Sequence, residues 1–122
     1  EKIFLVVEDM PRFPGCEEME GSKYEKKECG NGKMLEFVYG NIVYPEAARK
    51  AGVEGTIIVS FIITKSGSTK NPKIMRGIGS ECDAEVIRII NLMNEKGIQW
   101  ITGKQRGQAV DVRFNMPVKF RL

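Results

Sequence analysis

The sequence predicts an α+β domain, an antiparallel three-stranded sheet with two helices packed on one face. Apolar residues alternate strictly with polar residues or proline over 110–122, which indicates a strand with one buried and one exposed face. Two further strand-like stretches, 53–64 and 69–76, are separated by a short polar turn and are typical of a hairpin. An apolar stripe at helical spacing over 80–94 predicts a helix that covers this sheet.

Composition narrows the function classes before any motif is considered. The 122 residues are 42% hydrophobic, enough for one packed core. The chain has no histidine, which excludes Ser-His-Asp triads, Cys-His pairs and histidine-containing zinc sites. Three cysteines cannot form a four-thiolate metal site, and a net charge of +3 is too small to indicate nucleic acid. We therefore expect a binding module without catalytic residues, cofactor or metal.

The N-terminal part of the chain is predicted to be an extension, residues 1–32, attached to a main domain at 33–122. Residues 2–7 are β-branched and aromatic, so they indicate a strand that can extend the sheet. Residues 16–32 are rich in charge and poor in apolar side chains, and we expect a polar surface loop there.

A helical period begins at Lys33, with Met34, Phe37 and Val38 on one face, and ends near Gly40.

Two more helices have recognisable ends. Pro45 suits the first turn of a short helix that Gly52 stops. Ser80 is expected to be the N-cap of a longer helix, with Asp83 as its capping-box partner and an end near Asn94. The face of this longer helix that should be buried consists of Val86, Ile89, Ile90 and Met93.

The central strand at 53–64 has one fully apolar face, formed by Ile57, Val59, Phe61 and Ile63. The other face of this strand has both apolar and polar side chains, so we expect the strand to lie in the middle of the sheet. Residues 98–108 are predicted to be a connector. They include Trp100, expected to anchor the core, and a basic turn at 103–107, expected to be a solvated corner.

Pro117 indicates that the last strand lies at an edge of the sheet. Proline cannot donate a ladder hydrogen bond, so its nitrogen should face away from the neighbouring strand. The odd-numbered residues would then direct their backbone N–H and C=O groups to the open edge: Asp111, Arg113, Asn115, Lys119 and Arg121. Such an edge is either protected by charge or docks an extended peptide, and both readings stay open at this point.

The three cysteines fall into two groups. Cys16 and Cys29 could form a disulfide that closes a short loop and adds about 3 kcal/mol to the free energy of unfolding. The alternative is that both thiols are reduced. Cys82 lies in the first turn of a predicted helix, where the dipole favours a thiolate. We nevertheless expect a half-buried structural thiol there, with a reactive thiol as the alternative. Nearby Glu81, Asp83 and Glu85 suit the helix dipole better than a catalytic carboxylate pair.

Motifs over 42–122 resemble the TonB C-terminal domain family. They are Tyr44-Pro45, Ala48, Gly55-Thr56, the turn at Gly67, Lys73-Ile74, Asp83, the 103–107 turn and a final Val112-x-Phe114-x-x-Pro117-Val118-x-Phe120. Residues 10–15 also resemble a lead-in found in some members. The chain departs from the family at 100–103, where Trp-Ile-Thr-Gly replaces the frequent Trp-x-Pro-Gly.

The resemblance implies a periplasmic domain tethered to the inner membrane by a helix upstream of Glu1. It further implies binding to the TonB box of an outer-membrane transporter by strand addition, and force from the ExbB–ExbD motor, without nucleic acid. The implied peptide-binding residues are Val110, Asp111, Val112, Arg113, Phe114, Asn115, Met116 and Lys119. Apart from the resemblance, open sheet edges invite a strand-exchanged homodimer.

The sequence leaves open two other functions for the chain and one other role for its N-terminal strand. TonB-like domains also resemble the C-terminal ends of membrane-embedded zinc peptidase receptors, so the chain could be the interaction domain of such a receptor. An enzyme that uses Cys82 is a second reading, although the chain offers no histidine as a base. Finally, the strand at 2–7 could pair with a sheet edge and compete with an incoming peptide.

Overall fold

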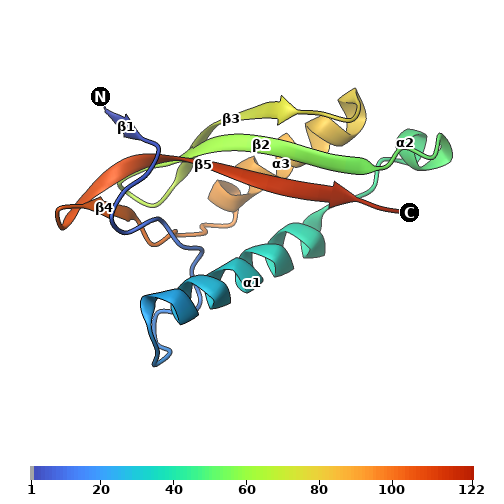
Figure 1. Ribbon diagram of the computed structural model, residues 1–122. Coiled ribbons are helices and arrows are strands. Elements are labelled where there is room, and N and C mark those ends of the chain that lie inside the picture. Colours follow the sequence, from blue (N-terminus) through green and yellow to red (C-terminus); the bar gives the residue numbers. More distant parts are fainter. Residues whose placement is uncertain (1) are drawn as a thin grey trace.

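The computed structural model describes residues 2–122, in which three helices lie against a curled sheet (Figure 1). In chain order the elements are β1 (Ile3–Phe4), α1 (Lys23–Asn41), α2 (Glu46–Lys50), β2 (Gly55–Ile63), β3 (Thr69–Arg76), α3 (Ser80–Glu95), β4 (Gly103–Gln105) and β5 (Gln108–Phe120). No helix within 2–122 is long and apolar enough to cross a membrane.

The sheet has the order β1-β5-β2-β3, and β4 forms a hairpin with β5. β2 pairs antiparallel with both β3 and β5, so the predicted three-stranded antiparallel sheet is confirmed. The N-terminal strand is shorter than expected, because only Ile3–Phe4 of the predicted 2–7 are paired. β1 runs parallel to β5, and the complete sheet is therefore mixed.

The core lies between the helices and one face of the sheet. On this face Ile57, Val59 and Phe61 of β2 stand opposite Val118, Met116 and Phe114 of β5. The α3 stripe Val86, Ile89, Ile90 and Met93 covers it and is fully buried, as predicted. Ile63, Val112 and Phe120 are also buried, whereas Leu122, at the end of the alternating pattern, lies beyond β5 and is exposed.

Helix α1 corrects the expectation of a polar loop over 16–32, since the chain is helical from Lys23 onward. Its start is set by a capping box at Ser22. The Ser22 hydroxyl accepts the Glu25 N–H at 3.2 Å, and the Ser22 N–H donates to the Glu25 carboxylate at 2.8 Å. The Ser-x-x-Glu spacing was visible in the sequence. The first turns of the helix have few apolar residues because they face solvent, so hydrophobic periodicity did not reveal them.

Helix α3 also begins differently from the prediction. Gly79, with φ 155°, occupies the N-cap position, and Ser80 is the first helical residue. Asp83 does not cap the helix either, because its carboxylate accepts the N–H of Ile78, the residue before the N-cap, at 3.0 Å. Cys82 is buried, and burial raises the pKa of its thiol, with the Asp83 and Glu81 charges acting in the same direction. A thiolate is therefore disfavoured, and Cys82 is a buried structural thiol, in line with the favoured expectation.

The connector at 98–108 holds an aromatic cluster and the short strand β4. Trp100 is 2% exposed, and its ring centroid lies 5.3 Å from that of Phe13, 6.0 Å from Phe61 and 5.5 Å from Phe114. It is the predicted core anchor. It also ties the N-terminal extension, through Phe13, to the central strands.

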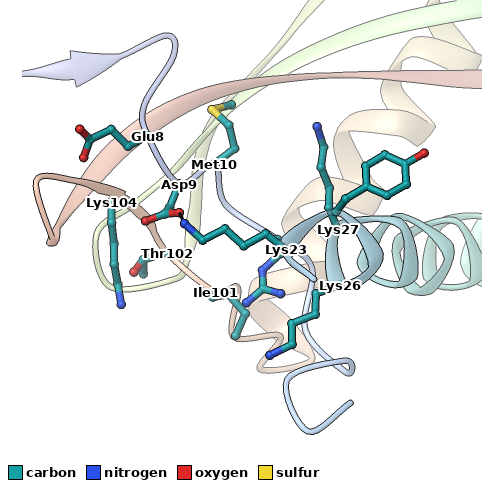
Figure 2. Close-up of a pocket in the computed structure, with 11 residues that line it drawn as sticks. Glu8, Asp9, Met10, Lys23, Lys26, Lys27, Ile101, Thr102 and Lys104 are labelled. Carbon is teal, nitrogen blue, oxygen red and sulfur yellow. Dashed lines mark hydrogen bonds and ion pairs between the residues drawn. The ribbon is translucent and has the colours of Figure 1, made fainter. Parts of the chain in front are cut away.

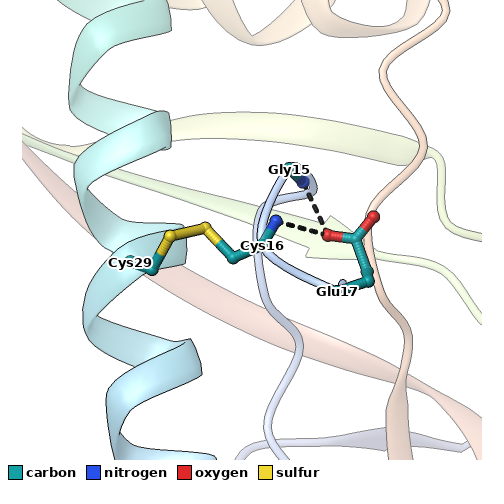
Figure 3. The surroundings of a disulfide bond; sticks show 4 residues. All are labelled: Gly15, Cys16, Glu17 and Cys29. Atoms are coloured by element: carbon teal, nitrogen blue, oxygen red, sulfur yellow. Dashed lines mark hydrogen bonds between the residues drawn. A yellow bond between two sulfur atoms is a disulfide. The ribbon is translucent and has the colours of Figure 1, made fainter. Parts of the chain in front are cut away.

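A disulfide between Cys16 and Cys29 fastens the N-terminal segment to α1 (Figure 3). The two Cα atoms are 6.1 Å apart. The next residue of the helix, Gly30, lies so close to Phe13 that an added Cβ would stand 3.1 Å from the Phe13 carbonyl oxygen. Beside Cys16, the Gly15 and Cys16 N–H groups donate to Glu17 and lower the pKa of its carboxyl.

Removing the disulfide should cost about 3 kcal/mol in free energy of unfolding, since it closes a loop with a sequence separation of 13 residues. We expect a double substitution, Cys16→Ser with Cys29→Ser, to lower the midpoint of urea unfolding accordingly. Reductant should shift the native protein to the same midpoint and leave the variant unchanged. Equal midpoints for native protein and variant under oxidising conditions would contradict this prediction.

Candidate functional site

The site predicted from the sequence is the outer edge of β5. On its inner side, β5 pairs with β2 from Val112 to Phe120. On its outer side, β1 pairs only with Asp111 and Val112. In the part of the chain that the structure describes, no strand pairs with residues 113–118 on that outer side. This stretch, roughly 20 Å long for an extended strand, is an open sheet edge.

The direction of the β5 backbone agrees with the inference from Pro117. The Lys119 N–H does not donate to β2 but to the hydroxyl of Tyr39 on α1, at 2.9 Å. Because backbone direction alternates along a strand, the N–H groups of Arg113 and Asn115 face the same outer side. Pro117 stands opposite Ile58 in the same register, and its missing N–H costs the β2–β5 ladder no hydrogen bond.

An apolar groove runs beside this edge, between β5 and α1. It has a volume of about 300 Å³ and is lined by Asn31, Met34, Leu35, Phe114, Asn115, Met116 and Pro117. Leu35, on the α1 side of the groove, is 45% exposed and so can be reached by a partner. A strand added to β5 would direct alternate side chains to the face occupied by Phe114 and Met116, and therefore into this groove.

The predicted site residues do not all share the same environment. Val110 pairs with Gly103 of β4, and Asp111 and Val112 are covered by β1. The Asp111 carboxylate is turned inward and accepts the Lys65 N–H at 2.8 Å. Arg113, Phe114, Asn115 and Met116 lie on the open stretch, although the Arg113 guanidinium donates to the Ser60 hydroxyl at 3.1 Å. Lys119 lies at its far end, against Tyr39.

Sequence reasoning missed the contribution of α1 to this site. Leu35 and Tyr39 are four residues apart and flank the buried stripe of Met34 and Val38. Residues at this spacing share one side of a helix. An apolar or aromatic pair on the rim of an otherwise amphipathic helix is the signal that could have identified the groove wall.

A second hollow, of about 450 Å³, lies at the N-terminal end of α1 (Figure 2). We call it the basic pocket. Its lining is Glu8, Asp9, Met10, Arg12, Lys23, Tyr24, Lys26, Lys27, Ile101, Thr102 and Lys104. Figure 2 shows the Lys23 ammonium group against the Asp9 carboxylate, at 2.6 Å. This hydrogen bond lowers the pKa of Asp9, and the charges of Lys104 and Arg12 act in the same direction.

The described residues contain no group of three or more cysteine or carboxylate side chains that could hold a metal ion. Besides the side chains of Arg113, Asn115 and Lys119, the polar groups at the β5 edge are backbone amides and carbonyls. Such groups can pair with another backbone but cannot act as acid, base or nucleophile at neutral pH. The geometry of the site is therefore suited to binding an extended chain.

Comparisons with known proteins agree with the architecture. The family described as Gram-negative bacterial TonB protein C-terminal matches residues 40–122. A structure of the Helicobacter pylori TonB C-terminal domain in solution is 19% identical, covers 85% of this chain and 97% of its own, and superposes with a TM-score of 0.57. A second structure of that domain is 19% identical, covers 74% of this chain and 90% of its own, and has a TM-score of 0.54. At this identity the two structures show the fold alone. No protein of curated function matches the sequence.

Proposed function

This chain belongs to the Gram-negative bacterial TonB C-terminal family, and from that premise we propose that it is the periplasmic, non-catalytic domain of a TonB-type energy transducer. In this proposal the TonB box of an outer-membrane transporter adds to β5 as a strand. Force from the ExbB–ExbD motor in the inner membrane then reaches the transporter through that pairing. The observation that carries the proposal is the open edge at 113–118, with its backbone donors directed outward.

Backbone pairing suits such a task for two physical reasons. Main-chain hydrogen bonds depend little on side chains, so one edge can accept varied peptide sequences. Several bonds loaded together share an applied force. Three or four added bonds at roughly 0.5–1.5 kcal/mol each predict weak and reversible binding. The same edge can pair with a second copy of the chain, which makes a strand-exchanged homodimer the competing assembly.

The proposal is tested by NMR titration with a synthetic TonB-box peptide. We expect the largest amide shifts at Arg113 and Asn115, and smaller ones at Leu35 in the neighbouring groove. If the peptide also displaces β1, the shifts will extend to Asp111 and Val112, which β1 covers. A peptide with proline at its centre, which cannot complete a ladder, is the matched control. Absence of shifts over 110–119 would overturn the proposal.

A further inference from the structure

We propose that the basic pocket binds acidic side chains of the same extended segment whose backbone docks on β5. The inference rests on the proposed function, because it assigns a second contact to the same partner. It adds a chemical preference that the backbone edge lacks, since main-chain pairing alone does not distinguish acidic from neutral peptides.

The charge of the pocket is unbalanced. Its lining has five basic side chains, of Arg12, Lys23, Lys26, Lys27 and Lys104, and two acidic ones, of Glu8 and Asp9. Both acids are already engaged. Asp9 pairs with Lys23, and the Glu8 carboxylate accepts the Arg106 N–H at 2.8 Å. Among residues 2–122, no other carboxylate forms an ion pair with the basic side chains of the pocket.

The placement of these lysines is unfavourable for the helix that carries them. Lys23 stands three residues before Lys26 and four before Lys27, so their like charges are neighbours on the helix surface. All three lie in the first turns of α1, where the helix dipole is positive and favours acidic side chains. Residues that oppose local stability in this way are expected where they serve binding. An anionic partner would remove the repulsion.

The pocket is held in a fixed frame by three segments of the chain. Backbone bridges join Asp9 to Lys104 and Arg12 to Ile101. The disulfide from Cys16 to Cys29 then fastens the same N-terminal segment to α1. The basic groups are therefore brought together before a ligand arrives, which lowers the entropic cost of binding.

The position of the pocket relates it to the β5 edge. Helix α1 lines the basic pocket with Lys23–Lys27 and the apolar groove with Asn31–Leu35. The centres of these two stretches are about 12 Å apart along the helix axis. An extended peptide covers that distance in about four residues. The partner should therefore have acidic residues about four positions from the apolar side chain that enters the groove.

The test compares three synthetic peptides with the same central Thr-Val alternation. In the first peptide a Glu-Glu pair stands four residues before the central valine, and in the second it stands four residues after it. Both are needed because the strand could dock in either direction. The third has Gln-Gln at both positions. We expect at least one acidic peptide to bind the native protein roughly three- to tenfold more tightly than the neutral peptide at low salt. The preference should vanish near 1 M salt, where the Debye length is about 3 Å.

The decisive variant combines Lys26→Gln with Lys27→Gln, and it should reduce the acidic preference to less than about twofold. The matched control combines Lys65→Gln with Lys96→Gln. These two lysines are exposed and lie outside the pocket, and the net charge changes equally in both variants. The control should keep most of the preference. An equal loss in both variants would indicate a general charge effect and overturn the proposal.

The outcomes separate this inference from the function on which it rests. If all three peptides shift the β5 amides with equal affinity, docking stands and the basic pocket is not part of recognition. If none shifts them, the docking proposal itself fails, and the pocket's role fails with it. If Lys26 and Lys27 matter for binding to phosphatidylglycerol vesicles but not to acidic peptides, the pocket recognises a lipid surface and the proposal is wrong.

Discussion

Replacing Asn115 by proline is expected to weaken binding of a TonB-box peptide by about tenfold or more, while the fold remains intact. The substitution removes an N–H group in the middle of the open stretch at 113–118 and places a proline ring against the incoming strand. One lost hydrogen bond accounts for roughly 0.5–1.5 kcal/mol, and 1.4 kcal/mol corresponds to tenfold in affinity. Isothermal titration calorimetry measures the affinity, and circular dichroism verifies the fold.

Two matched variants make this result specific. Asn115→Thr keeps the backbone donor and suits a strand, so its affinity should stay within about twofold of the native value. Met116→Pro, one residue further, removes a donor that faces Val59 of β2 and should cost about 3 kcal/mol or more in stability. If Asn115→Pro binds as tightly as the native protein, the partner does not add to this edge as a strand.

Replacing Trp100 by alanine is expected to lower the free energy of unfolding by about 3–5 kcal/mol. That is a large share of the roughly 5–15 kcal/mol typical of a domain. Trp100 is buried against Phe13, Phe61 and Phe114, so its removal leaves a cavity between the N-terminal extension and the sheet. Urea unfolding measures the loss. Peptide affinity should fall as well, because Phe114 forms part of the groove wall.

A second variant, Trp100→Phe, distinguishes the contribution of side-chain packing to stability from that of the indole N–H. The indole N–H is buried and has no hydrogen-bond partner among the described residues. Phenylalanine loses volume but removes this unsatisfied donor, which by itself costs about 1–3 kcal/mol. We therefore expect Trp100→Phe to be much less destabilising than Trp100→Ala. An exposed aromatic, Tyr24, serves as the control, since Tyr24→Ala should change stability by about 0.5 kcal/mol or less. Equal losses for the two Trp100 variants would contradict the cavity argument.

The elements that the sequence predicted well are those encoded by neighbouring residues. The period-2 alternation located β5, and the apolar face of 57–63 identified β2 as the central strand. The stripe from Val86 to Met93 identified α3. Each pattern is local, because burial on one face requires the same side-chain type at every second residue or every third to fourth. Pro117 indicated which side of β5 is unpaired, since proline lacks a backbone donor, but β5 is not the outermost strand because β1 pairs with Asp111 and Val112.

Predictions were wrong where local composition was ambiguous. The first half of α1 is polar on most sides and has the composition of a loop, because this part of the helix depends on a cap and a disulfide more than on a buried stripe. The connector concealed β4, a three-residue strand formed by a tight turn in which Arg106 and Gly107 have φ of 54° and 76°. Such a strand is too short to show periodicity.

By itself, the sequence determined the three antiparallel strands, with β2 in the centre, and the absence of histidine-based chemistry. Only the tertiary structure decided how much of the edge is open. β1 covers Asp111 and Val112, Tyr39 covers the N–H of Lys119, and α1 forms the groove between them. These contacts join residues about 80 or more positions apart in the chain. Their geometry depends on the packing of the whole fold, which no local pattern of side chains encodes.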